Sequence, residues 1–280
     1  MTLVTCDQLA PRIGDLDHNI TLSVNAIREA VDLGAEVVVL PELVSSGYAF
    51  ESLDEARSVA VGLDHRLFAA WQAAAGPRTT VVAGFCELGV DGLVYNSAAV
   101  VDVSGVRSVY RKTHLWDREK LIFTPGPTRP PVVDTRVGRI GVMICYDMEF
   151  PELIRSVALR GADLVAVPTN WPLVDRPMGE RPPEVTIAMA AARTNHLAIA
   201  CCDRAGVERG QHWTEGTTIV DEQGWVASSS ANGPLVMAEL DLTAARDKAI
   251  SPHNHVLGDR RPELYGDLNN TAQDSSSSHL

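Results

Sequence analysis

Residues 139–152 read RIGVMICYDMEFPE, and this stretch decides how the middle of the chain folds. Residues 139–144 are largely apolar and β-prone, which predicts a buried strand. The residues after Cys145 turn polar, and Pro151 suits the first position of a helix, where its missing N–H is not needed. We therefore expect Cys145 on a sharp strand-to-helix turn that faces a cleft. That placement suits a nucleophile, although free cysteine is also among the most buried residue types.

Two other predicted strands end in chemically active side chains. The strand over 37–40 leads to Glu42, and the strand over 106–111 leads to Lys112. In open α/β sheets, ligands bind beyond the carboxyl ends of the strands. We therefore expect a carboxylate, an ammonium and a thiol to meet in space although they are far apart in the sequence. Taken singly, Glu42 also suits a helix N-terminus, and Lys112 also suits a solvated strand end.

The composition is that of a globular protein without a basic surface. The chain has 280 residues, 45% hydrophobic and 21% charged, with a net charge of −12. This charge argues against nucleic acid or an anionic membrane as a partner, because both attract basic surfaces. The cysteines are odd in number and irregularly spaced, which favours reduced thiols in the cytoplasm. The first residues do not resemble a signal peptide, and no apolar run is long enough to span a membrane.

Strands and helices alternate along the chain. Helices are expected over 19–33, 53–75, 151–160 and 183–195. Strands are expected over 3–8, 37–40, 79–86, 96–103, 106–111, 132–134, 139–144, 164–167, 197–202, 217–221, 225–227 and 235–240. Because βα units mix with hairpins, we expect an α/β protein with two stacked mixed sheets and helices outside. We expect one domain over 1–268, followed over 269–280 by a disordered tail or an arm that contacts another subunit.

The active side chains lie within longer strings that occur together in a fixed order. These strings are Pro41-Glu42-Leu43 with Gly47-Tyr48, YRKTHL at 110–115, and CYDMEFPE at 145–152. With YNS at 95–97, FTPG at 123–126, GTTIVD at 216–221 and DRRPELY at 259–265, they resemble the nitrilase superfamily of carbon–nitrogen hydrolases over about residues 3–268. The string after Cys145 resembles the bacterial aliphatic-amidase-type branch most.

The resemblance implies a fold, a reaction and a set of catalytic residues. The fold is a four-layer α-β-β-α sandwich, commonly paired into a homodimer. The catalytic residues are a Glu42–Lys112–Cys145 triad, with Glu119 as a second glutamate that holds Lys112 or orients substrate and water. The reaction is hydrolysis of a small-molecule primary amide to an acid and ammonia through a cysteine thioester, and it needs no metal and no cofactor. A solvated charged turn remains the structural alternative for Glu119.

Four further residues are expected near the substrate. Asn170 and Trp171 follow the predicted strand over 164–167, on the same expected rim as the triad, and Tyr48 and Tyr146 are further candidates for substrate contact. Each also has an ordinary alternative, as a loop or packing residue. Charged substrates would need a matching charge, for which the candidates are Arg176, Arg181 and Arg193.

Other activities remain open at this point. The same triad serves a nitrilase or an N-carbamoyl hydrolase, and a non-catalytic or ammonia-donating partner subunit is a different class of function. A papain-like hydrolase would use histidine as its base, which the lysine and the mixed βα pattern argue against. Cys201-Cys202 and His253-Asn254-His255 lack the paired spacing of a zinc site, so no metal is expected.

Overall fold

The computed structural model describes residues 1–230 and 233–269. The chain divides into two compact units, Met1–Asp247 and Lys248–Leu280, which are described separately. The single domain over 1–268 stays a prediction. The tail expected over 269–280, with its four serines, lies outside the described residues apart from Asn269.

Two large mixed sheets form the centre of the first unit. The seven-stranded sheet has the order β13-β14-β1-β2-β3-β4-β5, and the five-stranded sheet has the order β12-β9-β8-β7-β6. In the first sheet the strands are β1 (Thr2–Asp7), β2 (Val37–Val39), β3 (Thr80–Leu88), β4 (Val94–Asp102), β5 (Gly105–Arg111), β13 (Ser229–Ser230) and β14 (Leu235–Leu240). In the second they are β6 (Val132–Asp134), β7 (Arg139–Val142), β8 (Leu164–Pro168), β9 (Ala198–Cys202) and β12 (Thr218–Val220). β1–β2–β3 and β7–β8–β9 pair in parallel, and the other neighbours pair antiparallel.

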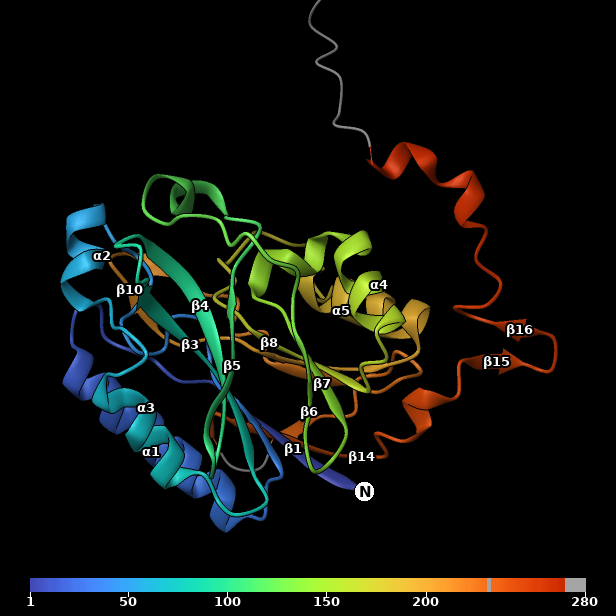
Figure 1. Cartoon of the computed structure of the whole chain (residues 1–280), viewed down its shortest axis with the longest axis horizontal. Helices are drawn as coiled ribbons and strands as arrows, with labels where there is room; N and C mark the ends of the chain where they lie inside the picture. The colour runs from blue at the N-terminus through green and yellow to red at the C-terminus, as the bar shows by residue number, and fades with distance from the viewer. Residues whose placement is uncertain (231–232, 270–280) are drawn as a thin grey trace, which may run out of the picture. The chain divides into compact units, whose positions relative to one another are not determined.

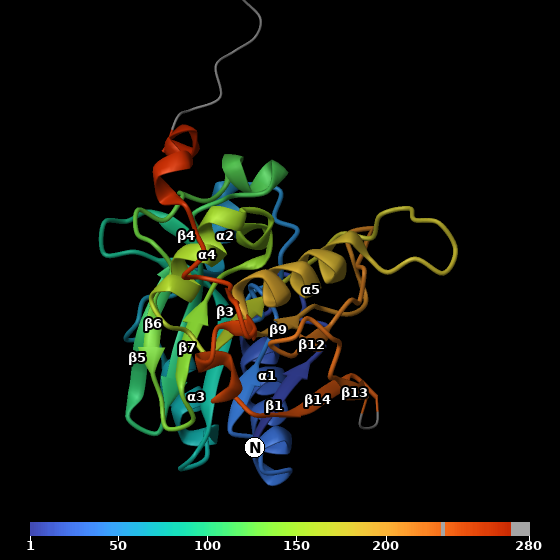
Figure 2. The same ribbon diagram turned by 90° about the vertical axis from the view of Figure 1, so that its right-hand side faces the viewer.

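Helices cover the outer face of each sheet, which confirms the four-layer α-β-β-α sandwich. The sheets face each other through β1, β2 and β3 on one side and β8 and β9 on the other. Helices α1 (Leu16–Asp32) and α3 (Arg66–Ala74) lie on the seven-stranded sheet, and α4 (Pro151–Leu159) and α5 (Pro183–Asn195) lie on the five-stranded sheet (Figures 1 and 2). The indole N–H of Trp71 ties α3 to α1 by donating to Ser23 Oγ at 2.9 Å.

Local sequence signals set most helix ends. α1 begins after Asp15, whose carboxylate accepts from the backbone N–H of His18, and it ends just before Gly34 at φ +89°. α4 starts at Pro151, as the sequence predicts, and α5 has the predicted bounds.

The single helix predicted over 53–75 is wrong. The structure has α2 (Leu53–Val59) and α3 instead, separated by a segment that pairs with the edge of β3. Val61 donates to Cys86 O at 3.0 Å and accepts from Leu88 N at 3.0 Å. His65 then caps α3 by accepting from the backbone N–H of Leu67. Backbone hydrogen bonds to a strand distant in the sequence therefore override the helical pattern of the segment.

The later hairpins also differ from the prediction in detail. The strand predicted over 225–227 forms only a bridge between Val226 and Val220. A small hairpin of β10 (Val207–Glu208) and β11 (Gln211–His212) was not predicted. The second unit, by itself, contains the hairpin β15 (Ala249–Ser251) and β16 (Asn254–His255) and two 3₁₀ turns, η4 (Pro262–Leu264) and η5 (Gly266–Asn269).

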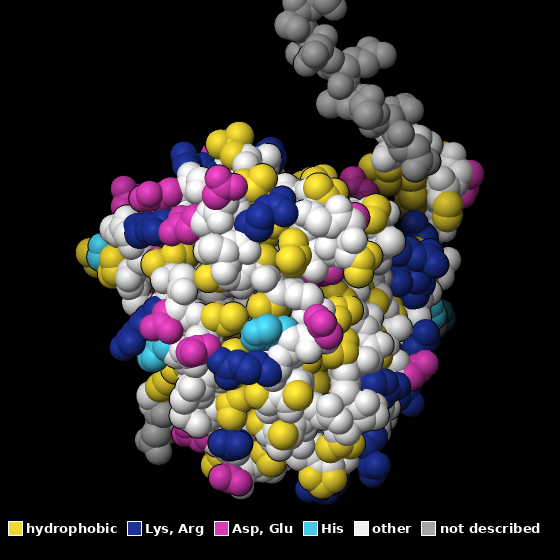
Figure 3. Space-filling model, turned by 60° about the vertical axis from the view of Figure 1, so that its left-hand side comes forward, with side chains coloured by type: hydrophobic (Ala, Val, Ile, Leu, Met, Phe, Trp, Pro, Cys, Tyr) yellow, Lys and Arg dark blue, Asp and Glu magenta, His cyan; other side chains and the backbone are white. Residues whose placement is uncertain are grey.

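The surface carries both signs of charge. Figure 3 shows acidic, basic and hydrophobic side chains interspersed on one face of the molecule. Among the helices of residues 1–230 and 233–269, none has the length and apolar character needed to cross a bilayer.

Candidate active site

The predicted catalytic residues follow strands of both sheets. Glu42 and Lys112 come after β2 and β5 of the seven-stranded sheet, and Cys145 comes after β7 of the five-stranded sheet. β5 runs in the same direction as β2, because β2 and β3 are parallel and two antiparallel pairings then lead to β5. The carboxyl ends of β2 and β5 therefore point to one edge, as the sequence predicts.

Glu42 is a fully buried carboxylate with one bonded oxygen and one unbonded oxygen. Oε1 accepts from Lys112 Nζ at 2.6 Å and from Asn96 Nδ2 at 2.7 Å. Within the described part of the chain, Oε2 has no hydrogen-bond partner. Burial raises the pKa of Glu42 to about 7, against the opposing effect of Lys112 and with a further contribution from the charge of Glu119. Such a carboxyl group can take up and release protons near neutral pH.

The turn that carries Glu42 depends on a close approach to β3. A Cβ added at Gly84 would lie 2.4 Å from the backbone nitrogen of Leu43 and 2.6 Å from Glu42 Cα. Leu43 itself has φ +49°, a conformation uncommon for a side-chain-bearing residue. Asn170, which follows β8 of the five-stranded sheet, donates from Nδ2 to the backbone carbonyl of Glu42 at 2.9 Å. The backbone around Glu42 is therefore fixed on both sides.

Lys112 places its ammonium between two carboxylates, with no exposed side-chain surface. Its Nζ donates to Glu42 Oε1 at 2.6 Å and to Glu119 Oε1 at 2.8 Å. Burial alone would lower the pKa of Lys112, but Glu119 and Glu42 outweigh it and hold the pKa well above its ordinary value. The lysine therefore stays charged. Of its three N–H donors, two are used by these contacts, which leaves one for another acceptor.

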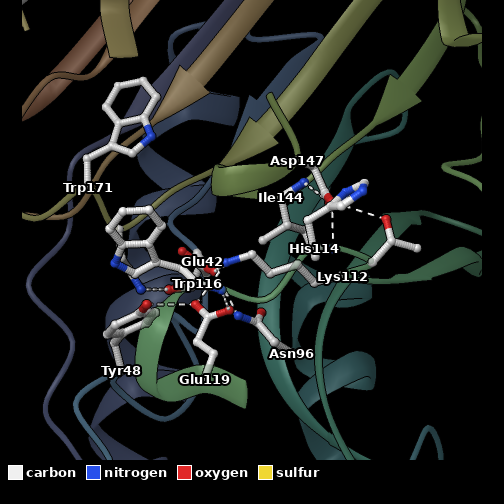
Figure 4. Close-up of polar contacts among 12 residues, drawn as sticks. Glu42, Tyr48, Asn96, Lys112, His114, Trp116, Glu119, Ile144, Asp147 and Trp171 are labelled. Carbon is white, nitrogen blue, oxygen red and sulfur yellow. Dashed lines mark hydrogen bonds and ion pairs between the residues drawn. The ribbon is translucent and has the colours of Figure 1, made fainter. Parts of the chain in front are cut away.

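Glu119 belongs to the 3₁₀ turn η1 (Asp117–Leu121), and only 4% of its surface is exposed. Besides Lys112, its Oε1 accepts from the hydroxyl of Tyr48 at 2.7 Å, and its Oε2 accepts from the backbone N–H of Trp116 at 3.0 Å. Figure 4 shows the glutamate between the tyrosine and the lysine. The solvated-turn alternative for Glu119 therefore does not hold.

Cys145 starts the 3₁₀ turn η2 (Cys145–Glu149) with φ +46°, on the sharp turn that the sequence predicts. Its sulfur interacts electrostatically with Glu42, Lys112 and Glu119 and is hydrogen-bonded by the backbone of Asn170. Burial, reinforced by the Glu42 charge, raises the pKa of the thiol well above its ordinary value, although Lys112 lowers it. The charge of Lys112 favours the thiolate, but burial and the charge of Glu42 outweigh it, so the resting sulfur is a thiol.

A cavity of about 400 Å³ lies beside Glu119 and Tyr48. Its wall is mainly aromatic and aliphatic, and charged side chains occupy other positions. The apolar lining consists of Tyr48, Ala49, Phe50, Trp116, Ile122, Phe123, Pro172 and Trp213, and the polar lining consists of Glu51, Asp117, Arg118, Glu119, Arg209 and Gln211. Tyr48 and Trp213 pack edge to face with ring centroids 5.4 Å apart. The space is suited to a small organic molecule.

Of the four predicted substrate contacts, Tyr48 lines this cavity. The Tyr146 ring packs against Trp116 at 4.9 Å and lines a separate cavity of about 470 Å³. Asn170 uses its side chain to hold the Glu42 backbone. Trp171 is buried, its backbone N–H donates to Asp203, and in Figure 4 its ring lies away from Glu42 and Lys112.

Several residues of the site were not found from the sequence. Asn96 lies in the predicted strand and bonds Glu42, and Trp116 and Trp213 contribute large parts of the cavity wall. A buried asparagine within an apolar strand was the available signal for Asn96, because a buried amide needs a polar partner. Trp116 lies in a loop and Trp213 in an isolated β-bridge with Pro172, and neither carried a comparable signal.

Comparisons with known proteins agree with this geometry. The carbon–nitrogen hydrolase family matches residues 3–249. A nitrilase from Pyrococcus abyssi is 36% identical and covers 95% of this chain and 99% of its own length. An (R)-stereoselective amidase from a Pseudomonas species is 35% identical and covers 93% of this chain and 92% of its own length.

Solved structures extend the likeness to the fold and to a reactive cysteine. One is a mutant amidase from Nesterenkonia sp. AN1, in which acrylamide has added to the active-site cysteine. It is 25% identical, has a TM-score of 0.75, and covers 96% of this chain and 100% of that chain. A matching family over most of the chain, close relatives over nearly its full length and a shared fold lead to one conclusion. The chain belongs to the carbon–nitrogen hydrolase family, within the nitrilase superfamily, and is an enzyme that hydrolyses carbon–nitrogen bonds.

Proposed function

We propose that this enzyme converts a primary amide to a carboxylic acid and ammonia through a thioester on Cys145. One observation carries the proposal. Within the described residues, one oxygen of Glu42 has no hydrogen-bond partner, its pKa is raised to about 7, and its charge acts on the Cys145 thiol beside the charged Lys112. A base, a nucleophile and an oxyanion donor are the groups that acyl transfer requires.

Acylation begins when the thiol proton of Cys145 passes to Glu42 and the sulfur attacks the amide carbon. The remaining N–H of Lys112 and the backbone N–H of Tyr146 donate to the oxygen that becomes negative. The carbonyl then re-forms, the C–N bond breaks, and Glu42 returns the proton to the departing ammonia. Glu119 keeps the lysine in place through its 2.8 Å contact.

Deacylation repeats the same proton transfers with water. Glu42 removes a proton from water while the oxygen attacks the thioester carbon. The C–S bond breaks, and the sulfur regains its proton from Glu42, so the acid leaves and the enzyme returns to its starting state. All of the proton transfers run through one carboxyl group.

The cavity favours a substrate with a neutral, largely apolar acyl group. Its cationic lining residues are Arg118 and Arg209. Arg209 already donates to Glu55 Oε2 at 2.8 Å and to the Ala49 carbonyl at 2.9 Å, and the acidic side chains of Glu51 and Asp117 line the same cavity. Arg176, Arg181 and Arg193, the earlier candidates for a carboxylate contact, do not line it.

The catalytic assignment is tested by ammonia release and intact-protein mass spectrometry. Cys145→Ala should lower turnover by about 10⁴-fold or more, because nucleophile and base act as a unit. Glu42→Gln should retain the fold and lose acylation. Cys86→Ala, which changes a buried cysteine elsewhere in the first unit, should keep turnover and should still form the acyl adduct with a slow substrate. Activity that survives in Cys145→Ala would contradict the proposal.

A substrate panel separates the remaining activities. We expect kcat/KM for butyramide or a phenylalkyl amide to exceed that for a dicarboxylic acid monoamide by at least about tenfold, since an unpaired carboxylate would enter an apolar space. Nitriles and N-carbamoyl compounds should react more slowly than amides. Preference for a nitrile would assign the alternative activity to the same residues.

We further propose that the enzyme is a cytoplasmic homodimer that binds neither nucleic acid nor membrane. The cysteines of the described residues are buried and unpaired, which suits a reducing compartment. Sedimentation at several concentrations tests the dimer, and fractionation of native cells tests the location.

A further inference from the structure

Asp147 is a buried carboxylate that accepts hydrogen bonds from both segments of the active site. It is fully buried and lies two residues after Cys145. Its Oδ2 accepts from Tyr110 OH at 2.8 Å and from the backbone N–H of Ile144 at 3.1 Å. Its Oδ1 accepts from Thr113 Oγ1 at 3.1 Å, from the backbone N–H of His114 at 3.1 Å and from His114 Nδ1 at 2.8 Å. Figure 4 shows Asp147 beside Ile144 and His114.

These donors belong to two different sheets. Tyr110, Thr113 and His114 surround Lys112 in the sequence, at the end of β5 in the seven-stranded sheet. Ile144 immediately precedes Cys145 and follows β7 in the five-stranded sheet. One carboxylate therefore joins the lysine segment to the nucleophile turn.

The same carboxylate supports the unusual backbone of Cys145. A residue with a side chain at φ +46° stays there only when its surroundings hold it. Asp147 Oδ2 accepts from the backbone N–H of Ile144, and the backbone N–H of Asp147 donates to Ile144 O at 3.0 Å. Two hydrogen bonds therefore join the residue before Cys145 to the residue two positions after it. The His114 ring adds a second connection, since it stacks on Phe150 with ring centroids 3.7 Å apart.

We propose that Asp147 is a positioning residue that sets the separation and orientation of the Lys112 ammonium and the Cys145 sulfur. The inference rests on the proposed function, because the lysine must reach the oxyanion that forms on attack by sulfur. Without the Asp147 contacts, the lysine segment and the nucleophile turn would lose the hydrogen bonds that join them directly. Misplacement by about 1 Å can lower a rate by about 10²-fold.

The test compares Asp147→Asn with a matched control, Asp163→Asn. An amide of the same size keeps the packing but replaces one acceptor oxygen with a donor. Asp163 is also a buried carboxylate of the first unit, and it accepts from the backbone N–H of Arg139 at 2.9 Å and from Arg246 at 3.1 Å, before β8 begins. Both variants should lose thermal stability, but only Asp147→Asn should lower kcat by about 10²-fold, with KM changed less than about threefold.

Two further measurements keep the inference testable if Asp147→Asn folds poorly or the enzyme proves not to be an amidase. Tyr110→Phe keeps the ring and removes one donor to Asp147, and kcat should fall by about tenfold. The rate of Cys145 alkylation by iodoacetamide needs no turnover, and it should fall in Asp147→Asn and Tyr110→Phe but not in Asp163→Asn.

The outcomes separate the two proposals. If the wild type hydrolyses no amide but alkylation slows in Asp147→Asn, the proposed function fails and the positioning role stands. If folded Asp147→Asn and Tyr110→Phe retain the kcat and the alkylation rate of the wild type, the positioning role is overturned whatever the substrate.

Discussion

At the scale of single residues, the site combines a charged lysine, a neutral thiol and a carboxyl group that titrates near neutrality. The lysine lies between Glu42 and Glu119, and these carboxylates stabilise its charge more than burial destabilises it. The same carboxylates and the burial keep Cys145 protonated. In the proposed reaction this proton passes to the Glu42 oxygen that has no hydrogen-bond partner in the described part of the chain.

The titration of Glu42 predicts how the rate depends on pH. Glu42 accepts a proton only when it is ionised, and its pKa is raised to about 7. We therefore expect kcat/KM to rise with pH through an apparent pKa near 7, a value that belongs to the coupled group of charges. Initial rates between pH 5 and pH 9 measure this limb. A limb near 4.5, the ordinary value for glutamate, would contradict the role of Glu42.

Removal of a neighbouring charge provides an internal check. Glu119 raises the pKa of Glu42 through its negative charge. Any activity that remains in Glu119→Gln should therefore have its acid limb at lower pH than the wild type. Ser228→Ala, which changes a small polar side chain of the 226–228 segment outside the site, should leave the limb unmoved.

At the scale of elements, the proposed catalytic side chains lie on short turns that immediately follow strands. The turn at Glu42 lies against β3, and the absence of a side chain at Gly84 allows the two backbones to approach. Leu43 and Cys145 both adopt positive φ on such turns, which is typical of backbone held in place at functional sites. The strands thus fix the positions of the turns, and the turns orient the side chains that they carry.

Gly84→Ala should damage the site through this contact. The new methyl group would meet backbone atoms of Leu43 and Glu42 at 2.4 Å and 2.6 Å, and backbone cannot move aside as a flexible side chain does. We expect a loss of stability of about 1–3 kcal/mol and a fall in kcat of at least about tenfold. Urea unfolding and steady-state kinetics measure the two effects.

Gly266→Ala is the matched control for this change. A Cβ at Gly266 would meet no atom within 4 Å, so stability and kcat should remain near their wild-type values. Equal effects of the two substitutions would show that contact with the Glu42 turn is not the cause.

At the scale of the whole molecule, buried carboxyl groups make the folded state sensitive to pH. Burial raises the pKa of Asp7 and of Asp203 to about 6, and that of Glu42 to about 7. Between their ordinary values and these raised values, the folded protein binds protons that the unfolded chain has released. The contribution of these groups to stability therefore decreases as pH rises from about 4 to about 7.

Asp7→Asn tests this linkage. No side-chain partner contacts Asp7 Oδ1 in the described ranges, so the amide should be tolerated and should remove the ionisation penalty. The difference in unfolding free energy between pH 5 and pH 8 should shrink by about 1–3 kcal/mol relative to the wild type. Asp54→Asn, at an exposed position of α2, should leave that difference unchanged. If the difference in unfolding free energy between pH 5 and pH 8 were larger in Asp7→Asn than in the wild type, burial of Asp7 would not be the cause of the lower stability at high pH.

The sequence predicted the sheets and the meeting of Glu42, Lys112 and Cys145 because both depend on strand patterns and on where strands end. It did not predict the break between α2 and α3, since that break depends on hydrogen bonds between Val61 and β3. Nor did it reveal that the side chain of Asn170 holds the Glu42 backbone. Contacts between the two sheets have no signature in local periodicity, so this hydrogen bond of Asn170 could not be predicted, and its predicted contact with substrate stays a prediction.

Because Glu42 and Lys112 follow strands of one sheet and Cys145 follows a strand of the other, neither half of the sandwich holds all three proposed reacting groups. During refolding, turnover can start only after the halves have docked, whichever half forms first. Recovery of enzymatic activity during refolding therefore reports the docking of the two sheets, which spectroscopic signals of helix and strand formation do not distinguish.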